Sequence, residues 1–85
     1  MLTAFVLVDA DSASIAEVGR ALATLEGVAE VYSVTGDEDL IAVLRVADHE
    51  QIARIVTEDI AALDGVLRTR TMIAFRQYDP ADIGF

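Results

Sequence analysis

The residues best suited to hold a small molecule form one short segment, Thr35-Gly36-Asp37-Glu38-Asp39. A glycine lets the backbone turn with its N–H groups exposed, which suits a carboxylate, and the adjacent acids suit an ammonium group. These are the two ends of an amino acid. An ordinary solvated hairpin turn is the alternative. An acidic metal site is a third interpretation, although three adjacent carboxylates lack the spacing of a calcium loop.

Arginines form a second candidate cluster near the end of the chain. Arg68, Arg70 and Arg76 share one parity of an apolar segment, and Thr69 and Thr71 share the other. Guanidinium groups in such a row would recognise a carboxylate or form ion pairs between subunits. The alternative is pairing with acids of the same chain, which stabilises little where the pair is exposed.

The spacing of polar residues indicates no enzyme centre. His49 is the single histidine and follows Asp48 where a helix is expected to begin, so it is interpreted as an exposed first-turn residue. Tyr32 and Tyr78 could donate hydrogen bonds, but tyrosines on strands are commonly packing residues. A catalytic triad, a phosphate loop, a nucleotide fingerprint and a nucleophile elbow are all missing. We therefore predict no catalytic residue, no metal and no cofactor.

Charge and composition narrow the classes of function. The 85 residues carry 15 acids against 6 arginines, and a net charge of −9 repels nucleic-acid backbones and anionic membranes. Cysteine is absent, which excludes disulfides and thiolate chemistry. The apolar start lacks a basic region and is too short to span a bilayer. We expect a cytoplasmic domain without direct contact to nucleic acid or membrane.

The apolar pattern predicts six elements in the order β-α-β-β-α-β. Short β-branched and aromatic runs predict strands, and apolar residues at helical spacing, behind a capping pair and before a glycine, predict helices. The expected strands are 2–8, 28–35, 40–46 and 66–77; the capping pairs are Ser14 with Glu17 and Asp48 with Gln51; the helix stops are Gly27 and Gly65.

This order predicts an α+β domain of the ferredoxin-like kind. Right-handed crossovers place both helices on one face of a four-stranded antiparallel sheet. Strands 2–8 and 40–46 are apolar on both parities, Phe5 and Leu7 included. Because helices cover one face only, we expect the other face to pack against a second subunit in a two-fold, sheet-to-sheet dimer, an α+β sandwich. The alternative is that short edge strands and the tail 79–85 cover that face.

Two stretches, Gly27–Leu40 and Asp64–Thr71, resemble the effector domain of the Lrp/AsnC family of transcription regulators. That domain is called RAM, for regulation of amino acid metabolism. The Gly-x-x-Asp turn at Gly36, the Gly-Val pairs and the Thr-x-Thr strand carry the resemblance, which covers essentially the whole chain. It implies a RAM effector domain over 1–78 and a C-terminal tail over 79–85.

The resemblance also implies a function. In the family, dimers joined through their sheets assemble into rings such as octamers, and amino-acid effectors bind where dimers meet. Full members begin with a helix-turn-helix domain, whereas this chain begins at the first effector strand. The resemblance therefore implies a stand-alone module that senses a small amino acid, alone or together with full-length regulators. The implied ligand-binding residues are Thr35, Gly36, Asp37, Glu38, Asp39, Leu40, Thr69 and Thr71.

Two other functions stay open. One is a structural subunit that joins rings of full-length regulators without binding a ligand. The other is a small dimeric ferredoxin-like enzyme, such as a cofactor-free oxygenase or a heat-stable isomerase. For that enzyme, His49 with Tyr32 would have to supply the polar group of a cavity.

Overall fold

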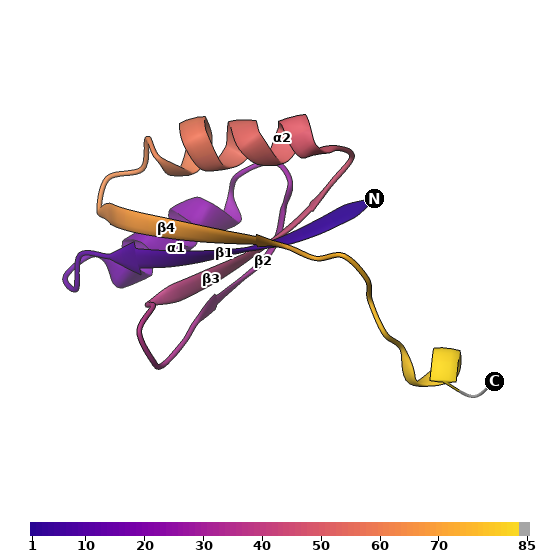
Figure 1. The fold of residues 1–85 in the computed structure, drawn as a ribbon. Helices are drawn as coiled ribbons and strands as arrows, with labels where there is room; N and C mark the ends of the chain where they lie inside the picture. Colours follow the sequence, from indigo (N-terminus) through magenta and orange to yellow (C-terminus); the bar gives the residue numbers. More distant parts are fainter. Residues whose placement is uncertain (84–85) are drawn as a thin grey trace.

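A computed structural model describes residues 1–83 of the chain. Its strands form one antiparallel sheet in the order β2-β3-β1-β4, and the helices lie together on one side of it (Figure 1). This is the predicted ferredoxin-like α+β arrangement. The elements are β1 (Leu2–Ala10), α1 (Ile15–Ala23), β2 (Val28–Ser33), β3 (Leu40–Val46), α2 (His49–Arg54), the π-helix η1 (Ile55–Ile60), β4 (Val66–Ile73) and the 3-10 turn η2 (Pro80–Ile83).

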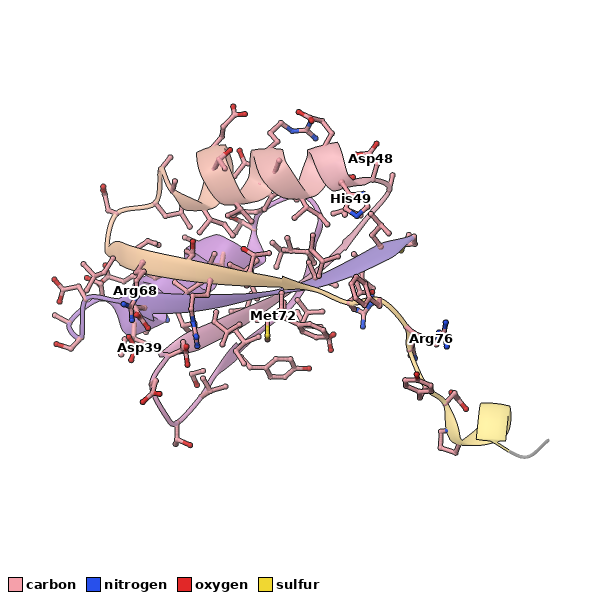
Figure 2. All side chains as sticks on the ribbon, in the orientation of Figure 1. Asp39, Asp48, His49, Arg68, Met72 and Arg76 are labelled. Carbon is pink, nitrogen blue, oxygen red and sulfur yellow. The ribbon has the colours of Figure 1, made fainter. Side chains whose placement is uncertain are left out.

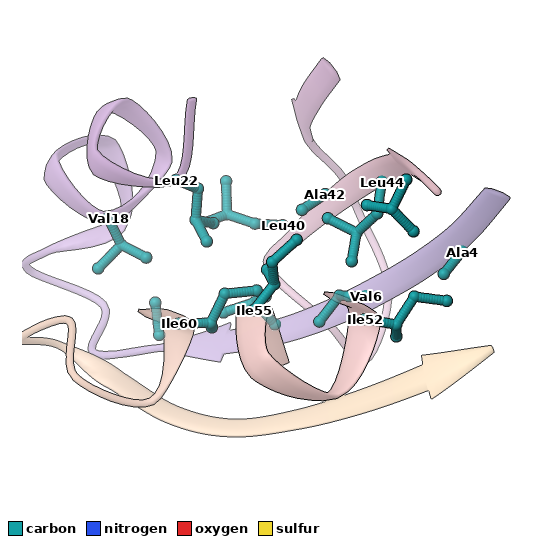
Figure 3. Packing of buried hydrophobic residues seen from close by; sticks show 13 residues of the cluster. Ala4, Val6, Val18, Leu22, Leu40, Ala42, Leu44, Ile52, Ile55 and Ile60 are labelled. Atoms are coloured by element: carbon teal, nitrogen blue, oxygen red, sulfur yellow. The ribbon is translucent and has the colours of Figure 1, made fainter. Parts of the chain in front are cut away.

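The hydrophobic core lies between the sheet and the helices. Successive strand residues point to opposite faces, so the even-numbered residues of β1 and β3 share the helix side; Val6 pairs with Ala42 in this register. Side chains of the helices pack against these strand residues (Figure 3). The core comprises Ala4, Val6, Val8, Ala10, Val18, Leu22, Leu40, Ala42, Leu44, Val46, Ile52, Ile55 and Ile60.

The other side of the sheet, here called the outer face, is also apolar. Its centre consists of Phe5, Leu7, Ile41, Val43 and Met72, which are neighbours across β3, β1 and β4. Met72 is 54% exposed and points away from the helices (Figure 2). The predicted two-sided apolar sheet is therefore confirmed, and among residues 1–83 no second layer covers the outer face.

The last strand is shorter than predicted. β4 ends at Ile73, and only the Ala74 N–H adds one further bond, to the Thr3 carbonyl. In this register Phe75 would lie opposite Leu2, the first residue of β1, so residues from Arg76 onward have no strand to pair with. The chain then runs away from the body (Figure 1). The expectation of a strand over 66–77 is wrong beyond Ile73, and the described part of the tail, 79–83, does not cover the outer face.

The two helix starts differ from each other. The predicted capping bond of Ser14 is not formed; instead the Ser14 N–H donates to the Asp11 carbonyl. At α2 the prediction is confirmed, because Asp48 Oδ1 accepts the Gln51 N–H at 2.9 Å. No helix within residues 1–83 has the length and apolar character needed to cross a membrane.

The second helix changes its winding after Arg54. Residues 55–60 form a π-helix, in which the hydrogen-bonding repeat is five residues. Ile55 and Ile60 are five apart, and both are fully buried against the sheet. The wider winding therefore keeps both isoleucines in the core.

Glycine is required at the two helix-to-strand junctions. Gly27 and Gly65 have φ angles of 91° and 94°, which side-chain-bearing residues rarely adopt. A Cβ on Gly27 would lie 2.6 Å from the Ile55 Cδ1 atom, so the junction also packs closely beneath the helix. The predicted helix stops are confirmed.

Candidate functional site

The candidate binding turn joins β2 to β3 and is fixed at both ends. The Val34 N–H donates to the Asp39 carbonyl at 3.0 Å, and the Asp39 N–H donates to the Val8 carbonyl at 3.1 Å. Asp39 Oδ2 also accepts the Ala10 N–H at 2.9 Å. These bonds tie the turn to the end of β1, so its central residues are held by a stable frame.

The backbone between these anchors is free to bind. Within the described residues, none of the N–H groups from Thr35 to Glu38 donates to a protein acceptor. Gly36 has a φ of 118°, and a Cβ there would meet nothing within 4 Å. Its backbone angle therefore requires glycine, and no neighbour crowds it. The turn presents unpaired N–H groups to solvent, an arrangement suited to a carboxylate.

The three acids of the turn have different surroundings. Asp39 is bound to backbone, and Glu38 forms an ion pair with Arg70. Asp37 is exposed and makes no hydrogen bond or ion pair within the described residues. Only Asp37 is therefore available to an ammonium group. Across residues 1–83 no three His, Asp or Glu side chains are grouped to hold a metal ion.

The arginines of β4 are occupied by acids of their own chain. Arg68 Nε and Nη2 both donate to Asp9 Oδ2, at 3.0 and 2.8 Å. Arg70 lies on the same outer face and reaches Glu38. The intramolecular alternative is thus confirmed for both, and both guanidinium groups are largely exposed, so each pair stabilises little. Arg76 lies beyond the strand (Figure 2) and forms no ion pair among the described residues.

Asp9 is a residue whose position the sequence analysis missed. It belongs to β1 rather than to the following turn, and its Oδ1 atom is buried without a hydrogen-bond partner in the described structure. The available signal was its parity, since Asp9 continues the Phe5 and Leu7 row on the outer face. Its second oxygen is the one bound by Arg68.

The candidate threonines lie on the other face of the sheet from the contact that the β2–β3 turn makes with β4. Thr69 pairs with Val8 and Thr71 with Val6, which places both on the helix side of the edge strand β4. Arg70, the residue between them, faces the outer side and pairs there with Glu38 of the turn. The two threonines and the Glu38 contact therefore lie on opposite faces of β4.

A hydrogen-bonded group on the outer face contains Tyr32. Its hydroxyl donates to Glu30 Oε2 at 2.6 Å, and Arg45 Nη1 donates to Glu30 Oε1 at 3.2 Å. The Tyr32 bond, aided by Arg45, lowers the pKa of Glu30, and the same bond raises the pKa of Tyr32. His49 lies instead at the exposed start of α2 (Figure 2). The pair required by the enzyme alternative is therefore on opposite sides of the sheet.

Two hollows mark the surface of the subunit. One, about 390 Å³ in volume, lies on the outer face where the chain leaves β4, and we call it the outer hollow. The other, about 770 Å³, runs between α1 and β2 beside Gly19 and Ala29. Neither includes Gly36 or Asp37. Residues Gly36 and Asp37 of the candidate turn therefore lie outside both hollows.

Comparison with known proteins identifies the domain. A family model described as the Lrp/AsnC ligand binding domain matches residues 3–82. The chain belongs to the Lrp/AsnC family. A helix-turn-helix-type transcriptional regulator of Pyrococcus furiosus is 40% identical over 76 residues, which are 86% of this chain and 51% of the regulator. This Lrp/AsnC domain thus spans about half the length of the curated relatives it matches, which are named as transcriptional regulators.

Solved structures agree with this identification. A Thermus thermophilus protein is 48% identical with a TM-score of 0.89, and the match covers 93% of this chain and 99% of that one. The feast or famine regulatory protein of Mycobacterium tuberculosis, solved with L-methionine, is 28% identical with a TM-score of 0.78 over 94% of this chain and 54% of its own. The resemblance to the Lrp/AsnC ligand-binding domain and the ferredoxin-like fold are confirmed.

Proposed function

We propose that this Lrp/AsnC domain binds a small amino acid at the turn Thr35–Leu40. The supporting observation is that one turn combines unpaired N–H groups over Thr35–Glu38 with a single free carboxylate, that of Asp37. A zwitterionic ligand needs N–H groups for its carboxylate and a carboxylate for its ammonium group, about one residue apart along the turn. The complex of the Mycobacterium tuberculosis relative with L-methionine supports an amino acid as the ligand class.

The anchored frame supports this role energetically. Asp39 and Glu38 are engaged with Ala10 and Arg70, so the turn is held in one conformation before the ligand arrives. A preorganised site loses less conformational entropy on binding than a mobile loop does. In this proposal Glu38 and Asp39 act mainly by holding the turn, while Gly36 and Asp37 touch the ligand.

Assembly would complete the pocket. We propose that two subunits pack outer face to outer face, and that these dimers join further so that a neighbour closes the open side of the turn. Thr69 and Thr71 are then supplied by another subunit, because within one subunit they face the helix side of β4, away from the outer face where Glu38 meets Arg70. Such an assembly, alone or together with longer family members, would pass ligand occupancy on to a transcription regulator.

A binding screen with matched variants tests the proposal. Each of the twenty amino acids is added at millimolar concentration, thermal shift is recorded, and any responder is titrated calorimetrically. We expect Asp37→Asn to weaken binding at least tenfold without changing ligand-free melting. The control is Asp64→Asn, which changes another exposed acid beside a glycine and should bind as the wild type does. If no amino acid binds the wild type, the proposal is wrong.

A structural role without a ligand is the second candidate. It is favoured by the apolar outer face. It is also favoured by the curated relatives, which are transcriptional regulators in which the matching segment makes up about half of the length. Mixing the protein with a full-length family member and weighing the assemblies by native mass spectrometry tests it. Mixed rings that form without any amino acid, from a protein that binds none, would support this role. Self-assembly driven by an amino acid would contradict it.

A further inference from the structure

The segment that follows β4 holds two large aromatic side chains in solvent. Residues 74–79, here called the arm, leave the sheet as an extended segment (Figure 1). Phe75 is fully exposed and Tyr78 is 74% exposed. Within the described residues, the Ala74 N–H bond to Thr3 is the arm's one backbone bond to the sheet. Large aromatic side chains held in water this way typically mark an interaction surface.

The outer hollow lies directly beside the base of this arm. Its volume is about 390 Å³, and Phe5 and Val43 line it together with the polar pair Glu30 and Arg45. Phe75 borders the hollow, yet the residue is fully exposed, so its ring does not fill it. An exposed aromatic side chain and an unfilled hollow therefore lie next to each other on the outer face.

We propose that the arm lies on a second copy of the chain and places its Phe75 ring in the partner's outer hollow. The arrangement rests on the outer-face dimer of the proposed function. In a two-fold dimer each contact occurs twice, so both hollows are filled by one arrangement. When the two-fold axis passes near the arm and the hollow, each arm lies next to the hollow of the partner, and both contacts can form.

The length and charge of the arm fit this occupant. Phe75 follows Ile73 by two residues, a backbone reach of about 7 Å, and its aromatic side chain extends further across the spacing of about 10 Å between packed sheets. Arg76 is the cation of the arm and forms no ion pair among the described residues. The hollow is lined by Glu30, Arg45 and Arg76, so it carries no excess of negative charge although the chain carries −9. This end of the outer face therefore adds nothing to the repulsion between two acidic subunits.

Dimer dissociation measures the contribution of the ring. Phe75→Ala is expected to raise the dimer dissociation constant at least tenfold in sedimentation equilibrium, with an unchanged circular dichroism spectrum because the ring packs on nothing in its own subunit. Ala53→Ser, on the exposed side of α2, is the control and should dimerise as the wild type does. A dimer unaffected by Phe75→Ala overturns the arm contact alone. A monomeric wild type overturns the outer-face dimer as well.

Cross-linking between chains tests the location, because the sequence contains no cysteine. A Phe75→Cys protein is mixed with a Thr3→Cys protein and oxidised at low concentration. A mixed disulfide is expected, whereas replacing the Thr3→Cys partner with Ala53→Cys should give none. Equal yields from both partners contradict the proposal. It is also wrong if Phe75→Ala spares self-association but abolishes assembly with a full-length regulator, since the arm then serves another partner.

Discussion

Comparing alanine substitutions of Asp39 and Asp37 should distinguish the residue that holds the binding turn from the residue that contacts the ligand. Asp39 Oδ2 accepts the Ala10 N–H at 2.9 Å, and Ala10 is buried at the end of β1. The substitution removes this acceptor and leaves the Ala10 N–H without a partner. Because the same bond ties the turn to the sheet, stability and ligand binding should fall together.

The size of the effect follows from the kind of bond. A hydrogen bond to a charged group contributes about 1.5–3 kcal/mol to the free energy of unfolding. The Asp39 side chain is only partly buried, and solvent screening places the expected loss at the lower end, about 1–2 kcal/mol. Asp39→Asn keeps an oxygen acceptor but loses the charge, so its loss should be roughly half as large.

Urea unfolding followed by circular dichroism measures these losses. Asp37→Ala is the matched control, since it removes a neighbouring acid that makes no bond among the described residues. Its midpoint should equal that of the wild type, while its ligand affinity falls. If Asp39→Ala and Asp37→Ala unfold at the same urea concentration, the anchoring role of Asp39 is refuted.

Four further predictions concern the fold and the hydrogen-bonded group on the outer face. Gly27→Ala should lower the free energy of unfolding by about 2–4 kcal/mol, because it combines a positive φ with overlap on the core. Gly36→Ala has the φ penalty alone and should lower the free energy of unfolding by about 1–2 kcal/mol. Thermal unfolding compares the two variants. Ile60→Ala removes a fully buried side chain and should cost about 2–5 kcal/mol in urea unfolding. The pKa of Glu30 is lowered below its ordinary 4.5, so its stabilising contribution is present above pH 4.5 and is lost as the pH falls through the folded-state pKa. Glu30→Gln should therefore be less stable than the wild type at neutral pH and approach it in acid. The pKa of Tyr32 is raised above 10.0, so its contribution is lost as the pH rises beyond that value; Tyr32→Phe should lose this alkaline step in a pH series of unfolding curves.

The sequence was sufficient to predict the strand Leu40–Val46, both glycine junctions and the apolar outer face. These features depend on local conformation and on strict alternation along a strand. The end of β4 was not predictable in this way, because residues after Ile73 have the same β-forming character and stop pairing only where β1 begins. The π-helical winding at Ile55 was also hidden, since helical spacing over six residues does not separate the two windings.

The candidate site was predicted as a segment but not in its internal roles. Sequence treats Asp37, Glu38 and Asp39 as three equivalent acids. The register of β1 against the turn decides that Asp39 binds backbone, and the parity of β4 decides that Arg70 meets Glu38. Such long-range contacts depend on how the strands align, so only the fold reveals that Asp37 remains free.

The most direct test of amino-acid binding at the turn is an amide nitrogen–proton NMR titration with the best ligand of the binding screen. We expect the N–H resonances of Thr35, Gly36, Asp37 and Glu38 to shift with ligand concentration, because these groups lack protein acceptors in the described structure. Resonances at the exposed start of α2, far from the turn, should not move. Saturable binding that leaves the four turn amides unchanged would contradict binding at the turn.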